Sequence, residues 1–223
     1  MLHTWPRAVI FDLDGTLVDS APDIAEAINA GFAPLGIAPF SVDAVKQLIG
    51  GGAAVAVQRA AKQLGVSLAP DDEAGVLERF METYARVSAD GRGLYPGALD
   101  VLRRLRDEGR HLALCTNKAE HITHITVEAL GIAGYFGAVV AARDDVPKKP
   151  DPAMLLKALS PFGVSPVDAV MIGDSHADID AAKAAGCRSI AVSYGYAISA
   201  AELGATAVVD NLAEIPAVLA RLR

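Results

Sequence analysis

Cysteine is scarce in this 223-residue chain, and long apolar runs are absent from it. The two cysteines, Cys115 and Cys187, form no CxxC pair and lack metal-ligand spacing, which argues against a zinc site and a disulfide framework. We expect both to be buried thiols in a reducing compartment. No segment approaches the roughly 18 apolar residues of a membrane helix, and the N-terminus lacks the features of a secretory signal. The sequence therefore predicts a cytoplasmic protein.

Positive charge is also in short supply, because 20 Lys and Arg stand against 27 Asp and Glu, which gives a formal net charge of −7. A surface of this sign does not attract nucleic acid or an anionic membrane, so we expect neither as a partner. An anionic small molecule must then be met locally, by a cation or by backbone amides. The length fits one large domain, or one domain carrying a smaller insert, and leaves a monomer and a homodimer equally open.

Short apolar runs alternate with helical stretches from about residue 96 to the end of the chain. Such alternation is typical of a parallel sheet covered by helices on both faces. We therefore predict an α/β fold, with a Rossmann-like, doubly wound parallel sheet as its core. The expected strands lie at 8–12, 111–116, 137–142, 169–174, 188–192 and 207–210, and the expected helices at 97–109, 119–131, 151–163, up to Gly186 and from about 211.

The segment at 20–92 breaks this alternation, since it is rich in alanine, helical in period and without a convincing strand. We predict that it forms a helical cap domain, inserted into a core made of residues 1–19 and 93–223. The chain would cross between the two units near residues 17–20 and again near 91–96. Two such crossings predict a hinge.

The run AVIFDLDGTLVDS at 8–20 is the most informative stretch, because an apolar strand ends on Asp12 and a second acid, Asp14, follows two residues later. Two close carboxylates at the end of a buried strand repel one another, which indicates that a cation occupies the site. An alternative, in which Asp12 caps a turn and Asp14-Gly15 is an ordinary turn pair, stays open for this motif taken alone.

Three further polar clusters also follow apolar strands, and the carboxyl ends of parallel strands share one edge of a sheet. We therefore expect all four clusters to meet in one cleft. They are Asp12 and Asp14; Thr116, Asn117 and Lys118; Lys149; and Asp174 with Asp178.

These residue types suit phosphoryl transfer assisted by Mg²⁺. Asp12 is the candidate nucleophile, which would form an aspartyl-phosphate, and Asp14 is the candidate general acid and base. Magnesium prefers oxygen ligands, which Asp12, the Asp14 backbone carbonyl and Asp174 would supply, and Asp178 would hold a metal-bound water or contact a ligand.

The negative phosphoryl oxygens need fixed donors, for which the candidates are Gly15, Thr116, Asn117 and Lys149. Other readings of single residues stay open. Asn117 and Asp174 could cap helices, and Lys149 could face solvent.

A glycine run at 50–52 within the predicted cap is the candidate for substrate selection. The backbone amides of Gly51 and Gly52 could approach a small substrate, and Arg59 could pair with a substrate carboxylate. An ordinary helix-start turn and an exposed arginine form the alternative, which stays open.

Together, DLDGT at 12–16, Thr116-Asn117, Lys149-Pro150 and GDSHAD at 173–178 resemble the haloacid dehalogenase-type phosphohydrolase superfamily. The resemblance implies a Rossmann-like core with a helical cap inserted after the first strand. An acid at position 14 implies phosphate-ester chemistry rather than dehalogenation. The absence of histidine between Leu17 and Gly36 disfavours mutase activity.

More closely, YPGALDVLRRLRDEG at 95–109, LALCTNK at 112–118 and LIGGGA at 48–53 are similar to bacterial phosphoglycolate phosphatases. This similarity implies Mg²⁺-dependent hydrolysis of 2-phosphoglycolate. Related enzymes for pyrophosphate, sugar phosphates, amino-sugar phosphates and nucleotides share much of the pattern. A protein that binds phosphate without turnover is the alternative from another class. The chain departs from the family pattern at Lys148, an extra lysine that we expect to be solvated.

Overall fold

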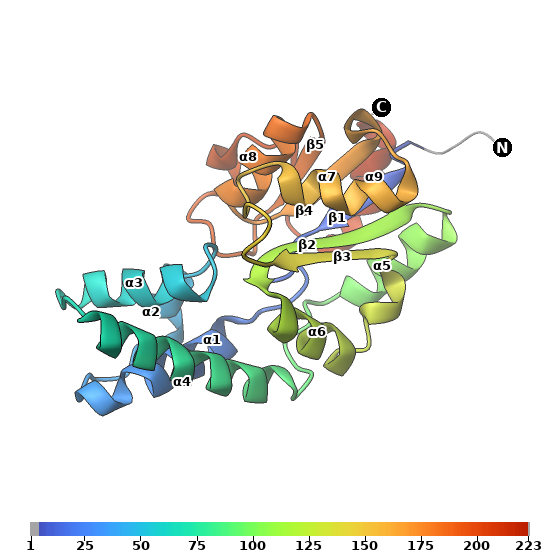
Figure 1. Cartoon of the computed structure of the whole chain (residues 1–223). Coiled ribbons are helices and arrows are strands. Elements are labelled where there is room, and N and C mark those ends of the chain that lie inside the picture. Colours follow the sequence, from blue (N-terminus) through green and yellow to red (C-terminus); the bar gives the residue numbers. More distant parts are fainter. Residues whose placement is uncertain (1–4, 223) are drawn as a thin grey trace.

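The computed structural model describes residues 5–222, in which one six-stranded parallel sheet is covered by helices on both faces (Figure 1). The strand order β3-β2-β1-β4-β5-β6 is that of a doubly wound sheet, so the predicted fold class is confirmed. The strands are β1 (Ala8–Phe11), β2 (His111–Ala119), β3 (Ala138–Ala142), β4 (Ala169–Gly173), β5 (Arg188–Val192) and β6 (Ala207–Val209).

Strand β1 lies at the centre of the sheet and sets where the functional edge falls. All four of its residues are buried, and its last residue, Phe11, is in register with Leu114 of β2 and Ile172 of β4. The chain winds outward from β1 in one direction through β2 and β3, and in the other from β4 through β5 and β6. The carboxyl ends of β1 and β4 therefore flank the switch point, where doubly wound sheets bind their ligands.

Alternate side chains of β1 enter two separate apolar clusters, one on each face of the sheet. Val9 and Phe11 pack with residues of α5 (Ala98–Asp107) and α9 (Ile215–Arg221). Ala8 and Ile10 pack with residues of α7 (Ala153–Leu159) and α8 (His176–Ala185) on the other face. Strand geometry explains this division, since successive side chains point to opposite faces.

The predicted helices are shorter than expected, and at two of them a 3₁₀ turn takes the place of one end. Helix α7 ends at Leu159, and a 3₁₀ turn at Ser160–Phe162 completes the segment predicted as a helix to 163. A proline at position 161 lacks the N–H that a continuing helix needs. Near the C-terminus, a 3₁₀ turn at Leu212–Glu214 precedes α9.

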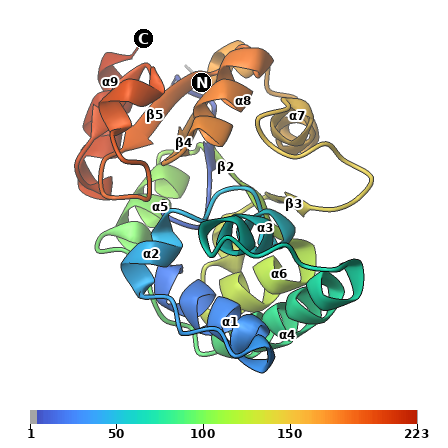
Figure 2. The same ribbon diagram turned by 90° about the vertical axis from the view of Figure 1, so that its left-hand side faces the viewer.

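Between β1 and α5 lie four helices, which we call the helical block together with the loops that join them: α1 (Ala21–Phe32), α2 (Val42–Lys46), α3 (Ala53–Gln63) and α4 (Pro70–Ser88). They group together beside α6 (Glu120–Ala129) in both views (Figures 1 and 2). Their apolar side chains form a cluster of their own, which reaches the rest of the molecule through Ile122 of α6. The cap boundaries at 20 and 92 stay a prediction.

The two chain segments that join the helical block to the sheet lie side by side. Asp19 N donates to Gly93 O at 2.7 Å, and Tyr95 N donates to Leu17 O at 2.9 Å. Both crossings therefore meet at one place, as a hinge would require.

Cys115 and Cys187 are buried free thiols, as predicted. Among residues 5–222, no helix has both the length and the apolar character that crossing a membrane requires.

Candidate active site

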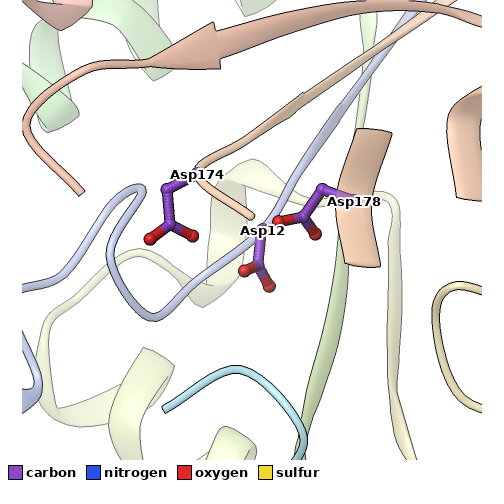
Figure 3. Close-up of side chains that lie close together, drawn as sticks. All are labelled: Asp12, Asp174 and Asp178. Atoms are coloured by element: carbon purple, nitrogen blue, oxygen red, sulfur yellow. The ribbon is translucent and has the colours of Figure 1, made fainter. Parts of the chain in front are cut away.

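Three buried aspartates gather at the switch point of the sheet (Figure 3). Asp12 follows β1, Asp174 follows β4, and Asp178 lies in the first turn of α8. One carboxylate oxygen from each lies within 4.8 Å of the other two. The fold thus concentrates acidic oxygens at one point that is shielded from water.

This crowding changes the proton affinity of the acids. Burial, followed by the charge of Asp178, raises the pKa of Asp12 to about 7, although Lys149 acts in the opposite direction. Burial and the charges of Asp178 and Asp12 raise the pKa of Asp174 well above its ordinary value. Repulsion of this kind is relieved when a cation binds between the carboxylates.

The acidic cluster fits a divalent metal ion. Asp12 Oδ1 is buried and has no hydrogen-bond partner within the described part of the chain. Carboxylate oxygens are the donors that hard divalent cations prefer. Asp12, Asp174 and Asp178 are therefore the residues that could hold the ion, whereas a contribution from the Asp14 carbonyl stays a prediction.

Lys149 is buried inside this cluster, so the reading in which it faces solvent is wrong. Its Nζ lies 2.9 Å from Asp12 Oδ1, an ion-pair distance without hydrogen-bond geometry. The ammonium donates instead to Cys115 O at 2.7 Å and to Asp178 Oδ1 at 2.5 Å. Burial favours the neutral amine, but the charges of Asp12 and Asp178 outweigh it and raise the pKa of Lys149. Lys149 therefore stays cationic beside the candidate nucleophile.

Asp178 has both carboxylate oxygens engaged. Oδ1 accepts from Lys149, and Oδ2 accepts from Ser175 N at 3.1 Å and from Ser175 Oγ at 2.6 Å, which forms a capping box at the start of α8. The carboxylate packs closely against Gly173, where an added Cβ would lie 2.4 Å from it. Asp178 is thus fixed in place and in turn orients Lys149.

Thr116 and Asn117 lie in the second half of β2. Thr116 Oγ1 accepts from Lys118 N at 3.2 Å, and its own hydrogen has no acceptor in the described residues. Asn117 Nδ2 donates to Lys149 O at 2.9 Å and to Gly50 O at 3.1 Å, and its Oδ1 accepts from Lys149 N at 3.0 Å. The Asn117 side chain therefore joins the Lys149 loop to the helical block, and its direct contact with phosphate stays a prediction.

Two of the predicted glycines lie so close to other site residues that a side chain would not fit there. Gly15 has φ +82°, and a Cβ there would lie 2.3 Å from Asp174 Oδ2. Gly52 has φ +87°, and a Cβ there would lie 3.0 Å from the carbonyl oxygen of Asn117. A side chain at either position would displace a site residue.

A cavity of about 430 Å³ opens between the edge of the sheet and the helical block. Its floor carries Asp12, Asp14, Thr116, Lys149 and Asp174 from the core. The helical block supplies a mostly apolar wall that includes Ile24, Ile49, Phe80 and Met81, together with Gly50, Gly52 and Arg59.

The cap residues predicted to bind substrate are placed differently from one another. Gly52 lines the cavity, whereas Gly51 is absent from its described lining and packs against Val55. Arg59 lines the cavity, but its Nη1 donates to Leu48 O at 3.2 Å and Ile49 O at 2.8 Å. Pairing of Arg59 with a substrate carboxylate stays a prediction.

Sequence reasoning missed two tyrosines at the site. Tyr84 of α4 binds the ammonium of Lys118, to which sequence reasoning gave no role. The backbone N–H of Tyr196 donates to Asp174 Oδ2 at 2.7 Å. Neither tyrosine belongs to a local motif, and each reaches its partner only through folding.

Comparison with known proteins places this geometry in a family. Residues 9–192 match the family model of the haloacid dehalogenase-like hydrolases. A phosphoglycolate phosphatase of Rhodospirillum rubrum is 42% identical over 215 residues, which cover 94% of this chain and 89% of that protein.

Solved structures agree with this placement. A crystal structure described as a predicted phosphoglycolate phosphatase, from Haemophilus somnus, matches with a TM-score of 0.89 and 31% identity, over 98% of this chain and 99% of that one. CbbY from Rhodobacter sphaeroides, crystallised with phosphate, matches with a TM-score of 0.79 and 28% identity, over 94% of this chain and 96% of that one. The four sequence motifs meet at one edge of the sheet, the family model covers most of the chain, and a relative is 42% identical to it. The chain therefore belongs to the haloacid dehalogenase-like hydrolases.

Proposed function

We propose that this protein is a Mg²⁺-dependent phosphatase that hydrolyses 2-phosphoglycolate to glycolate and phosphate through an aspartyl-phosphate on Asp12. The observation that carries the proposal is the carboxylate of Asp12, which is buried at the cavity floor beside Asp174 and Asp178 with an oxygen that lacks a hydrogen-bond partner within the described residues. The substrate is taken from the Rhodospirillum rubrum relative, whose name states it.

The first half of the reaction is a displacement at phosphorus. A carboxylate oxygen of Asp12 forms a bond to phosphorus, and the bond to the alcohol oxygen breaks. Asp14 lines the same cavity and gives its proton to that leaving oxygen.

The second half releases phosphate. Asp14, now ionised, takes a proton from water, and the resulting hydroxide displaces Asp12 from phosphorus. After the second step Asp12 is free and Asp14 carries a proton again, so atoms and protons balance over the two steps.

Charge on the transferring group is held by fixed groups. Lys149 is a buried cation 2.9 Å from Asp12, and Thr116 has a hydroxyl hydrogen available for a phosphoryl oxygen. We assign the backbone N–H of Asn117 to the same task. The N–H of Gly15 already donates to Val18 O at 2.8 Å, so we propose that Gly15 contributes by letting the substrate phosphate approach the main chain. A bound Mg²⁺, held by Asp12, Asp174 and Asp178 with the Asp14 carbonyl, would neutralise negative charge on the phosphoryl oxygens.

Other small phosphoesters remain candidates, because a cavity of about 430 Å³ admits alcohols larger than glycolate. These are pyrophosphate, sugar phosphates, amino-sugar phosphates and nucleotides. A cytoplasmic location and a monomeric or homodimeric state stay predictions.

The experiment is an assay of phosphate release from a panel of these esters, first with Mg²⁺ and then with excess EDTA. We expect the highest kcat/KM for 2-phosphoglycolate and a loss of about 10²-fold or more when the metal is removed. A low rank for 2-phosphoglycolate would contradict the substrate alone. No release from any ester by folded protein would favour a protein that binds phosphate without turnover.

A further inference from the structure

We infer that Lys118 recognises a carboxylate on the alcohol portion of the substrate, an inference that rests on the proposed phosphatase function. Lys118 directly follows Asn117 at the functional edge of β2, and it lines the cavity. Its side chain is only 2% exposed. A lysine is seldom buried so fully without a partner or a function.

Lys118 lies beside the residue that would protonate the leaving group. Its Nζ donates to Asp14 Oδ1 at 3.1 Å and to the hydroxyl of Tyr84. An ammonium has three N–H donors, so one remains without an acceptor among the described residues. The side chain of Asp14 is 14% exposed and reaches the cavity, so the unused donor lies next to the reaction space.

The reach of this ammonium matches a substrate with a carboxylate close to its phosphate. A general acid must come within about 2.6–3.2 Å of the oxygen that it protonates. In 2-phosphoglycolate the carboxyl carbon is attached to the same carbon as that oxygen. When Asp14 contacts that oxygen, the Lys118 ammonium bound to Asp14 is therefore close to the substrate carboxylate.

The other cations of the cavity are less suited to this task. Lys149 is held by Asp12 and Asp178 at the phosphoryl end. The Arg59 Nη1 is directed at two backbone carbonyls, and Lys46 pairs with Asp43 at 3.0 Å on the exposed side. Lys118 thus combines burial, an available donor and a position beside Asp14.

The helical block controls this contact through Tyr84. The Lys118 ammonium lies 4.0 Å from the centre of the Tyr84 ring as well as against its hydroxyl. An ammonium over an aromatic face is stabilised without losing its charge. The core therefore supplies the cation, and the helical block fixes its position.

A positioning role is the competing explanation, in which Lys118 acts only by holding Asp14 in place. The two roles differ in one measurable respect. Loss of a positioning residue slows every ester, whereas loss of a carboxylate contact slows only esters that carry the carboxylate.

The test compares 2-phosphoglycolate with ethyl phosphate, which has the same skeleton but no carboxylate, on the full-length enzyme with Mg²⁺. In Lys118→Met we expect the ratio of the two kcat/KM values to fall by about 10- to 150-fold, which is the range for losing a charged hydrogen bond. Most of the change should be in KM for 2-phosphoglycolate, with kcat/KM for ethyl phosphate within about 5-fold of wild type. The matched control is Lys46→Met, which removes a lysine of the same cavity and should leave the ratio unchanged.

An equal loss on both esters would overturn the inference and assign Lys118 to the positioning of Asp14. Turnover of ethyl phosphate reports that the variant is folded. If Lys118→Met does not fold, Lys118→Gln keeps hydrogen bonds to Asp14 and Tyr84 without the charge, and the same fall in the ratio is expected. An unchanged ratio in the variant that folds would refute the inference alone, whereas no phosphate release by the wild type from any ester would refute the proposed function and the inference together.

Discussion

The floor and the wall of the cavity differ in how they are built. The floor carries Asp12, Asp14, Thr116, Lys149 and Asp174, which lie in the second half of a strand or in the segment that follows one, at one edge of the parallel sheet. The wall consists of side chains from helices and loops of the helical block, which packs on its own apolar cluster. We therefore expect the residues at the sheet edge to carry out phosphoryl transfer. The position of the helical block against that edge should decide which substrate is accepted.

Two side-chain contacts join strand β2 to the helical block above the floor. Asn117 donates to Gly50 O, and Lys118 binds Tyr84. Both contacts start from adjacent residues of β2 and end on the helical block. We therefore expect a change at Asp12, Asp174 or Lys149 of the floor to affect all substrates alike. A change in the wall, or in Lys118, which binds the wall, should affect them unequally.

The largest expected effect comes from Asp12→Asn, which removes the proposed nucleophile. An amide is a poor nucleophile for phosphorus, so kcat should fall by about 10⁴-fold or more on every ester. Asp180→Asn, an exposed acid of α8, is the matched control and should keep wild-type turnover. Normal kcat in Asp12→Asn would exclude covalent catalysis at this position and would break the division between floor and wall.

A smaller effect concerns the binding of Mg²⁺ as pH changes. Because the pKa of Asp12 is raised to about 7 without metal, the ion must displace a proton below that pH. Apparent Mg²⁺ affinity should weaken by about tenfold per pH unit between pH 7 and pH 5 for one displaced proton. Titration calorimetry at several pH values measures this, and an affinity independent of pH in that window would place the ion elsewhere.

The smallest expected effect comes from Arg59→Met in the wall. Arg59 is exposed, and its Nη1 donates to the carbonyls of Leu48 and Ile49. Since loss of surface hydrogen bonds costs about 0.5–1.5 kcal/mol, we expect KM to change by about tenfold at most, with little effect on kcat. Lys62→Met on the same helix is the matched control. A loss of 100-fold or more on 2-phosphoglycolate, with ethyl phosphate unaffected, would assign the substrate carboxylate to Arg59 instead of Lys118.

The sequence predicted the floor better than the wall for a physical reason. Asp12, Asp174 and Lys149 each lie in a short motif at the end of an apolar run, and a parallel sheet brings such ends together. Tyr84 and Tyr196 have no such signal, because their contacts join residues 34 and 176 positions apart. Lys118 was visible as part of a polar cluster, but its burial depends on the packing of α4.

Helix ends show the same limit on a smaller scale. The period of the apolar residues predicted a helix through residue 163, yet α7 gives way to a tighter turn at Ser160. Apolar period identifies the face that a helix buries, while the end of the helix depends on local backbone chemistry. The sequence predicted that the backbone at Gly15 and Gly52 approaches the substrate. It did not predict the contacts that exclude a side chain there, since these come from Asp174 and Asn117, which are distant in the chain.

Tyr196 contacts both the acidic cluster and the segment that leads into the helical block. Its backbone N–H donates to Asp174 Oδ2. Its hydroxyl accepts from Ser20 N at 2.8 Å and from Ala21 N at 3.0 Å, where the chain enters α1. One residue thus connects Asp174, a candidate metal ligand, to the start of the helical block. Because both contacts involve one residue of the loop after β5, a movement of this loop should shift Asp174 and the start of α1 together.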